Sequence, residues 1–280
     1  MVRGVVHMVA ATVLFVCMNA IAKVLSTHLP PLEVVWARSA GHFVFVVALL
    51  APGHGWWRLF ETNNLRLQVG RSLIQVCSQM LFFTAIGHVQ LADATAVSFT
   101  GPLIVAALAR PLLGEVVTRS HWAAIAVGFA GALIVIRPGL GVSAYLLLIL
   151  GSSLCYALYQ LLTRRAAAYD RPQTSVTYSA LVGSIVLSVL VPFVWTRPSA
   201  TQWAGLATLG VLGGLGHYLV AHALAVAAAS IISPFHYVQI IWAAALGYLA
   251  FGDVPSGFTW LGAAVIIASG LFIAVKEARR

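Results

Sequence analysis

Hydrophobic residues gather into ten long runs, which are separated by short breaks rich in Pro, Gly and Arg. Most runs are close to the 20 residues that a helix needs to cross a hydrocarbon core of about 30 Å. The pattern therefore predicts an all-α membrane protein with ten transmembrane helices. The predicted spans are Gly4–Leu25, Leu32–Leu50, Leu67–Ile86, Leu91–Leu113, Ser120–Ile136, Val142–Thr163, Gln173–Trp195, Trp203–Leu224, Ser230–Phe251 and Gly257–Val275.

The ten runs are related in pairs by a constant offset of 138 residues. Glu115 follows a glycine at the end of the fourth run, and Asp253 follows a glycine at the end of the ninth. Each half of the chain holds five runs, so the second half enters the membrane from the opposite side. The sequence predicts two inverted five-helix repeats, residues 1–139 and 140–280, which is an architecture found in transporters.

The composition excludes an ordinary soluble protein. Of the 280 residues, 61% are hydrophobic and only 8% are charged, whereas soluble domains carry about 25% charged residues. The net charge of +9 would suggest nucleic acid in a soluble protein. Here most of the Lys and Arg residues fall in the breaks that lie on the side of the termini. The positive-inside rule therefore predicts a bacterial-type inner-membrane protein with both termini in the cytoplasm, and no nucleic-acid partner.

Neither the cysteines nor the glycine-rich eighth run has the pattern of a cofactor site. The three cysteines, Cys17, Cys77 and Cys155, lie inside apolar runs without CxxC spacing, so neither a disulfide framework nor a zinc site is expected. The eighth run is rich in glycine, but a nucleotide loop needs Lys-Ser/Thr after its glycines, and His217 follows instead. These glycines predict close helix packing or a hinge. We expect no cofactor and no metal.

Several motifs resemble those of the drug/metabolite transporter superfamily, EamA branch, and the resemblance extends from Val5 to Val275. The matching segments are Pro31–Arg38, Leu91–Ala94, Gly101–Pro102, Gly114–Glu115 and Arg137–Gly139. The resemblance implies a ten-helix carrier that exports amino acids or similar metabolites. Within the family, we prefer the branch of amino-acid exporters, including the aromatic amino acid type. Carriers of riboflavin, drugs, sugar phosphates and nucleotide sugars share this fold.

The second half departs from the family pattern in two places. Ile240 stands where Pro102 of the first half would predict a proline, and Asp253 replaces the usual Glu. We therefore expect the two halves to differ most near Pro102. The pattern leaves open whether the ninth helix is kinked like the fourth.

Charged residues avoid the predicted membrane centre. All seven acids lie at or near helix ends or in loops, which disfavours sodium coupling or a carboxylate relay. Histidine remains able to relay protons, or else hydrogen-bonds neighbouring helices. Lys23 and Arg38 either snorkel, pair with Glu33, or contact substrate. Because no cluster of cations lies at mid-depth, a neutral or zwitterionic substrate fits better than a phosphate.

Polar and aromatic residues form stripes at helical spacing, and in lipid such groups must face the bundle or a wet cavity. Pairs at the 138-residue offset, such as Phe99 with Tyr237, favour a cavity with aromatic walls and polar anchors. The alternative for each residue is helix packing. The candidate substrate-contacting residues are Asn19, Gln75, Gln79, Phe99, Tyr156, Tyr159, His217, Tyr218, His222, His236 and Tyr237.

These observations predict a secondary transporter that exports amino acids or similar metabolites by alternating access, as a monomer or weak homodimer. An intramembrane serine hydrolase would need Ser152 or Ser153 beside a histidine of the eighth run, and no spacing supports that pairing. A structural membrane subunit would leave the polar stripes unexplained. We therefore expect a transporter without catalytic residues.

Overall fold

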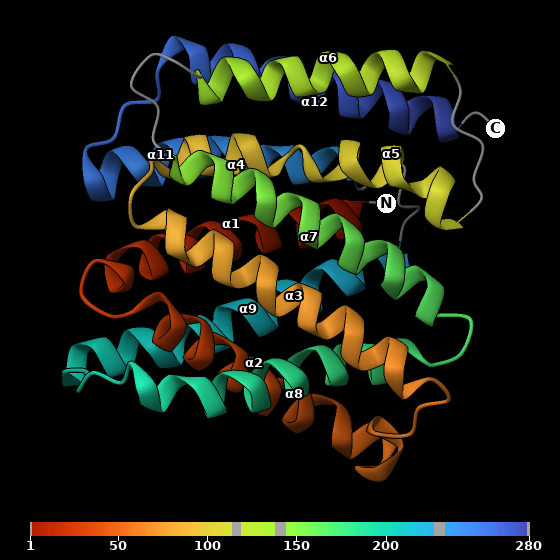
Figure 1. The fold of residues 1–280 in the computed structure, drawn as a ribbon, viewed down its shortest axis with the longest axis vertical. Coiled ribbons are helices and arrows are strands. Elements are labelled where there is room, and N and C mark those ends of the chain that lie inside the picture. The colour runs from red at the N-terminus through yellow and green to blue at the C-terminus, as the bar shows by residue number, and fades with distance from the viewer. Residues whose placement is uncertain (1, 114–118, 138–143, 227–232, 279–280) are drawn as a thin grey trace.

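A computed structural model describes residues 2–113, 119–137, 144–226 and 233–278, and these residues fold as one layered helical bundle (Figure 1). The α-helices are α1 (Val2–Ser26), α2 (Pro31–His54), α3 (Leu65–Ile86), α4 (Leu91–Ser98), α5 (Gly101–Leu113), α6 (Arg119–Ile136), α7 (Tyr145–Ala166), α8 (Pro172–Leu190), α9 (Ala200–Val226), α11 (Gln239–Phe251) and α12 (Gly257–Ala278). Three 3₁₀ segments join them: η1 (Trp57–Leu59), η2 (Val191–Phe193) and η3 (Ser233–Val238).

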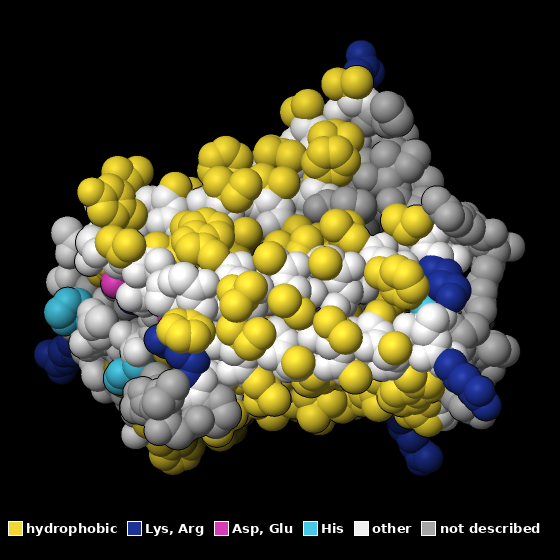
Figure 2. Space-filling model, turned by 90° about the horizontal axis from the view of Figure 1, so that it is seen from above, with side chains coloured by type: hydrophobic (Ala, Val, Ile, Leu, Met, Phe, Trp, Pro, Cys, Tyr) yellow, Lys and Arg dark blue, Asp and Glu magenta, His cyan; other side chains and the backbone are white. Residues whose placement is uncertain are grey.

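The described residues include nine helical segments that are long and apolar enough to cross a membrane, and a shorter apolar helix at Phe235–Phe251. The span at Leu91–Leu108 combines α4 with most of α5. The predicted all-α membrane fold is therefore confirmed. Hydrophobic side chains cover the middle of the face in Figure 2, and most of its Lys and Arg side chains lie toward the ends. Both termini emerge at the same end of the bundle (Figure 1).

Local sequence explains where several helices begin and end. Pro31 and Pro172 lie in the first turns of α2 and α8, where the missing N–H costs no hydrogen bond. The Asn64 side chain caps α3 by accepting a hydrogen bond from the Leu67 N–H. Gly252 ends α11 with a φ of 68°, a left-handed conformation that favours glycine.

The helices pack in a reciprocal pattern. Helix α1 lies against α9 and α11, and the segments 138 residues away pair in the same way, with α7 against α3 and α5. Helix α2 packs on α8, and α6 packs on α12. This is the pairing that two repeats related by a twofold axis would give.

Regular α-helix gives way to other geometry at equivalent positions of the two halves. A turn at Phe99 and Thr100 separates α4 from α5, and the 3₁₀ segment η3 precedes α11. The interruption thus occurs in both halves, although Ile240 replaces proline in the second. The two interruptions differ in kind, because one is a short turn and the other is a six-residue 3₁₀ segment.

Glycines let backbones meet directly at one helix crossing. A Cβ built at Gly41 of α2 would lie 2.8 Å from the Gly210 Cα of α9. A Cβ at Gly210 would lie 2.5 Å from the Gly41 Cα. Further along α9, Gly214 packs on the Phe45 ring and Gly216 on the Phe15 ring. The close packing predicted from the glycines of this helix is confirmed.

One ion pair closes the end of the bundle opposite the termini. Lys23 Nζ of α1 lies 2.7 Å from Asp253 Oδ2, which follows α11, and 4.5 Å from the centre of the Phe251 ring. Glu33 instead accepts a hydrogen bond of 2.8 Å from the Thr196 hydroxyl. The suggested pairing of Lys23 with Glu33 is therefore wrong, because the link after α11 brings a closer carboxylate.

Asp170 organises the end of the bundle that carries the termini. It lies between α7 and α8 and accepts hydrogen bonds from Thr62 Oγ1 (2.6 Å), the Asn63 N–H (2.7 Å) and Gln68 Nε2 (2.7 Å). Burial acts to raise the pKa of Asp170, but these hydrogen bonds and the charge of Arg71 together outweigh it, so the pKa lies below its usual value. This carboxylate ties the segment before α3 to the α7–α8 connection.

We expect Asp170→Asn to lower the thermal stability of the purified protein at neutral pH by roughly 1 kcal/mol, since the carboxylate is partly exposed. A depressed pKa means that the stabilisation is complete above the unfolded pKa of about 3.9 and is lost as the pH falls through the folded pKa. The difference in melting temperature between wild type and Asp170→Asn should therefore shrink below about pH 4. Glu61→Gln, an exposed acid in the same segment, serves as the control. A difference in melting temperature that does not change with pH would contradict the stabilising role of the Asp170 carboxylate.

Candidate functional site

A cavity of about 630 Å³ lies inside the bundle, within the range of about 300–1,000 Å³ that is typical of small-molecule sites. Its walls come from α1, α3, α4, α5, α7, α9, η3 and α11, as the polar stripes predicted, with additions from α2 and α12. The lining stretch of α12, Gly270–Ala274, lies near the C-terminal end of that helix. The cavity therefore extends toward the end of the bundle that carries both termini.

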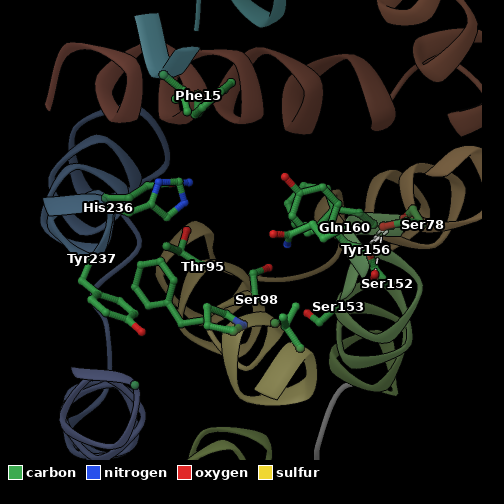
Figure 3. Close-up of a pocket in the computed structure, with 18 of the residues that line it drawn as sticks. Phe15, Ser78, Thr95, Ser98, Ser152, Ser153, Tyr156, Gln160, His236 and Tyr237 are labelled. Carbon is green, nitrogen blue, oxygen red and sulfur yellow. Dashed lines mark hydrogen bonds between the residues drawn. The ribbon is translucent and has the colours of Figure 1, made fainter. Parts of the chain in front are cut away.

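Aromatic rings form much of the cavity wall. Phe99 packs edge-on against Tyr237, with ring centres 4.9 Å apart, and these residues are equivalent at the 138-residue offset. Phe15 of α1 packs in the same way against His217 of α9 at 5.1 Å. In Figure 3, Phe15 and His236 face Tyr156 across the open space. Such walls suit a flat ring, because stacked and edge-on ring contacts are favourable.

The Tyr237 ring packs against α12 at Gly270, where no side chain occupies the space that its hydroxyl needs. A Cβ built at Gly270 would lie 2.0 Å from the Tyr237 hydroxyl oxygen. Only glycine leaves this space open. Helix α12 thereby positions a ring that η3 presents to the cavity.

Amides and hydroxyls supply the polar part of the lining. Ser78 of α3 and Ser152 of α7 hydrogen-bond each other, with their hydroxyl oxygens 3.0 Å apart. Gln75 keeps one amide oxygen without a partner among the described residues. Gln160 of α7 and the α4 residues Thr95 and Ser98 also point toward the open space (Figure 3). These groups can exchange hydrogen bonds with a polar substrate.

The charged residues of the described lining are Arg38 and Arg164, and this lining contains no Asp or Glu. Arg38 is only 8% exposed, and its Nε lies 3.4 Å from the Met18 sulfur. His217 and His236 also line the cavity. The site therefore favours a neutral or anionic ligand over a cationic one.

The structure brings eight of the eleven candidate residues to the cavity wall: Asn19, Gln75, Gln79, Phe99, Tyr156, His217, His236 and Tyr237. The other three lie elsewhere. Tyr218 is 38% exposed and its ring contacts His222, while the Tyr159 hydroxyl lies 3.1 Å from the Ser179 hydroxyl oxygen of α8. Consecutive residues of a helix point about 100° apart, and here His217 lines the cavity while Tyr218 turns toward the exposed side of α9.

Arg38, for which the sequence leaves snorkelling, pairing with Glu33 and substrate contact open, lines the cavity. A basic residue inside an apolar run marks a functional site by default. Ser152 and Ser153 do not form a hydrolase-like pair with histidine. Ser152 bonds Ser78, and the Ser153 hydroxyl donates to the Ile149 carbonyl.

Comparison with known proteins gives consistent results over almost the whole chain. The EamA-like transporter family matches residues 2–137 and again residues 143–275. One relative, a riboflavin transporter of Vibrio cholerae, is 29% identical over 99% of this chain and 95% of its own length. A pseudopaline exporter of Pseudomonas aeruginosa is 28% identical over 95% of this chain and 94% of its own.

Two further comparisons also match most of this chain. An S-adenosylmethionine uptake transporter of Rickettsia felis is 25% identical over 92% of this chain and 88% of its own. One crystal structure aligns over 99% of this chain and 98% of its own, with a TM-score of 0.68 at 16% identity. At that identity the likeness shows the fold alone.

Proposed function

The chain belongs to the EamA-like transporter family, and we propose from this premise that it carries a ring-bearing polar metabolite of the riboflavin type across the membrane. The observation that carries the proposal is the cavity, which combines aromatic walls with amide, hydroxyl and guanidinium groups. The names of two relatives, which are riboflavin transporters of about the same length, support this substrate class.

Export of amino acids is the second candidate, and Arg38 is the observation that favours it. A guanidinium would bind the substrate carboxylate. The described lining offers no Asp or Glu for the ammonium group, however, so that charge would meet only neutral acceptors. A larger ring system with hydroxyl or carbonyl groups makes better use of this cavity.

Residues 1–139 and 140–280 act in this proposal as inverted repeats that rock about the cavity. The cavity extends toward the termini, and the distribution of Lys and Arg supports a cytoplasmic location for that end in a bacterial inner membrane. In this proposal, the structure is an inward-facing state of alternating access. His217 and His236, which line the cavity, are the residues through which proton coupling would act.

The test is uptake into proteoliposomes, with riboflavin, tryptophan and smaller amino acids as substrates, with and without a proton gradient. We expect riboflavin to accumulate, and Tyr237→Ala to slow its uptake about tenfold, because a favourable ring contact contributes about 0.5–1.5 kcal/mol. Tyr248→Ala is the matched control, since Tyr248 lies on α11 with 61% of its surface exposed. Accumulation of amino acids without riboflavin would reject the flavin-type substrate in favour of the second candidate.

A further inference from the structure

Arg38 is a buried cation whose hydrogen-bonding capacity is largely unused. It lies on α2, lines the cavity and is 8% exposed. Its only hydrogen-bond partner among the described residues is the Met18 sulfur, at 3.4 Å from Nε, and thioether sulfur is a weak acceptor. Its guanidinium carbon lies 5.7 Å from the centre of the Phe83 ring. The guanidinium nitrogens other than Nε have no partner in the described chain.

A second buried arginine shows how this chain satisfies such a charge when the role is structural. Arg71 of α3 is fully buried, and it donates to Gln68 Oε1, Thr163 Oγ1, Ser179 Oγ and the Ser175 carbonyl. Its guanidinium is surrounded by oxygen atoms. Arg38 has no comparable set, although leaving a buried charge uncompensated costs several kcal/mol.

The described lining of the cavity supplies no carboxylate to Arg38. On the side of α9, a Cβ built at Gly213 would lie 3.3 Å from Met18 Sδ and 3.9 Å from Arg38 Nε. His217 stacks on His42 with ring centres 5.5 Å apart, and one ring nitrogen of His42 has no partner among the described residues. Tyr156 lies across the cavity (Figure 3). An incoming anion would therefore meet donors and no competing acid of the described lining.

We propose that Arg38 is the anion-binding residue of the cavity, and that it donates hydrogen bonds to a carboxylate or phosphate oxygen of the transported metabolite. This inference rests on the proposed function and deepens it: among ring-bearing metabolites, those with an acidic group should bind more tightly than neutral ones such as riboflavin. A guanidinium binds both oxyanions through two parallel N–H donors. The ring of the metabolite then lies among Phe15, Tyr156 and Tyr237, and its anionic group lies toward α2.

The test compares matched ligand pairs that differ only in charge, at constant ionic strength, on the full-length protein in nanodiscs. One pair is riboflavin and its 5′-phosphate, and the other is indole-3-acetate and its amide. We expect the wild type to bind the anionic member of at least one pair about tenfold more tightly. The pair that shows the preference distinguishes phosphate from carboxylate recognition.

Variants then assign the preference to Arg38. Arg38→Gln should reduce the affinity ratio within the preferred pair to about one, and Arg38→Lys should keep a reduced preference, because a point charge replaces the planar fork. Arg171→Gln, which removes an exposed arginine at the start of α8, should leave the ratio unchanged. Affinities are compared only for variants that elute as folded protein.

Two outcomes overturn the inference. The wild type could bind both members of each pair equally, a result that needs no variant, or Arg38→Gln could retain the full preference. If flavins bind and are transported regardless of charge, the role of Arg38 fails while the proposed function stands. If the wild type binds and transports no member of either pair, both fail.

Discussion

Replacing Gly210 by alanine is expected to separate α2 from α9 and to lower the stability of the folded protein by about 1–3 kcal/mol, the usual cost of overpacking. The added Cβ would lie 2.5 Å from the Gly41 Cα and 2.7 Å from its carbonyl carbon. These are backbone atoms, which cannot move aside as a flexible side chain would. Gly210→Ile should cost more and leave little folded protein, as measured by size-exclusion chromatography and melting temperature in detergent.

The control for this prediction is Gly70→Ala on α3, where an added Cβ has no neighbour within 4 Å. That variant should be neutral or slightly stabilising, because alanine is the better helix former. Equal melting temperatures for Gly210→Ala and Gly70→Ala would show that the α2–α9 crossing is looser than described. In membranes, where apolar surface alone does not drive helices together, such close backbone contact contributes much of the association.

Reversing the charge of Lys23 is expected to stop transport. In Lys23→Asp a carboxylate faces Asp253 at the end of the bundle opposite the termini, in place of the ion pair at 2.7 Å. Because aspartate is shorter than lysine, the two carboxylates would lie roughly 6 Å apart, where repulsion near a protein surface is on the order of 3 kcal/mol. A shift of that size moves a two-state equilibrium by roughly a hundredfold. The conformation closed at this end would then be too rare to complete the cycle.

The swapped double variant, Lys23→Asp with Asp253→Lys, should recover a substantial fraction of the uptake rate, because it restores opposite charges at the same contact. Arg197→Asp is the control, since it reverses an exposed charge in the α8–α9 link at the same end. Uptake at the wild-type rate by the single variant, or failure of the swap to improve on it, would remove the ion pair from the transport cycle.

The sequence was sufficient to predict the fold because the membrane imposes simple constraints on it. A helix that crosses lipid must be about 20 residues long and apolar, so the predicted bounds lie close to those observed, such as Gly4–Leu25 against Val2–Ser26. The sequence leaves open whether the second half is interrupted like the first, and the structure has a turn at Phe99 and Thr100 in one half and the 3₁₀ segment η3 at the equivalent place in the other. Glu115, which follows the glycine at the end of the fourth predicted run, lies outside the described residues.

The candidate site was harder to predict, because polarity alone does not say which way a side chain points. Gln75, Gln79 and Tyr156 line the cavity as expected. Tyr159, only three residues beyond Tyr156, instead forms a hydrogen bond with the Ser179 hydroxyl of α8. The role proposed for Arg38 depends on a fact that one sequence does not provide, namely that no Asp or Glu of the described chain lines the cavity with it. Partners far apart in sequence decide such questions.

The 3₁₀ geometry of η3 has a consequence for how the cavity could change shape. A 3₁₀ helix rises about 2.0 Å per residue, and an α-helix rises about 1.5 Å. Rewinding the six residues of η3 into α-helix would shorten the segment by about 3 Å and turn Tyr237 by roughly 40° relative to α11. Because Gly270 fits closely against the Tyr237 hydroxyl, such a screw motion would break this contact without any tilt of the surrounding helices.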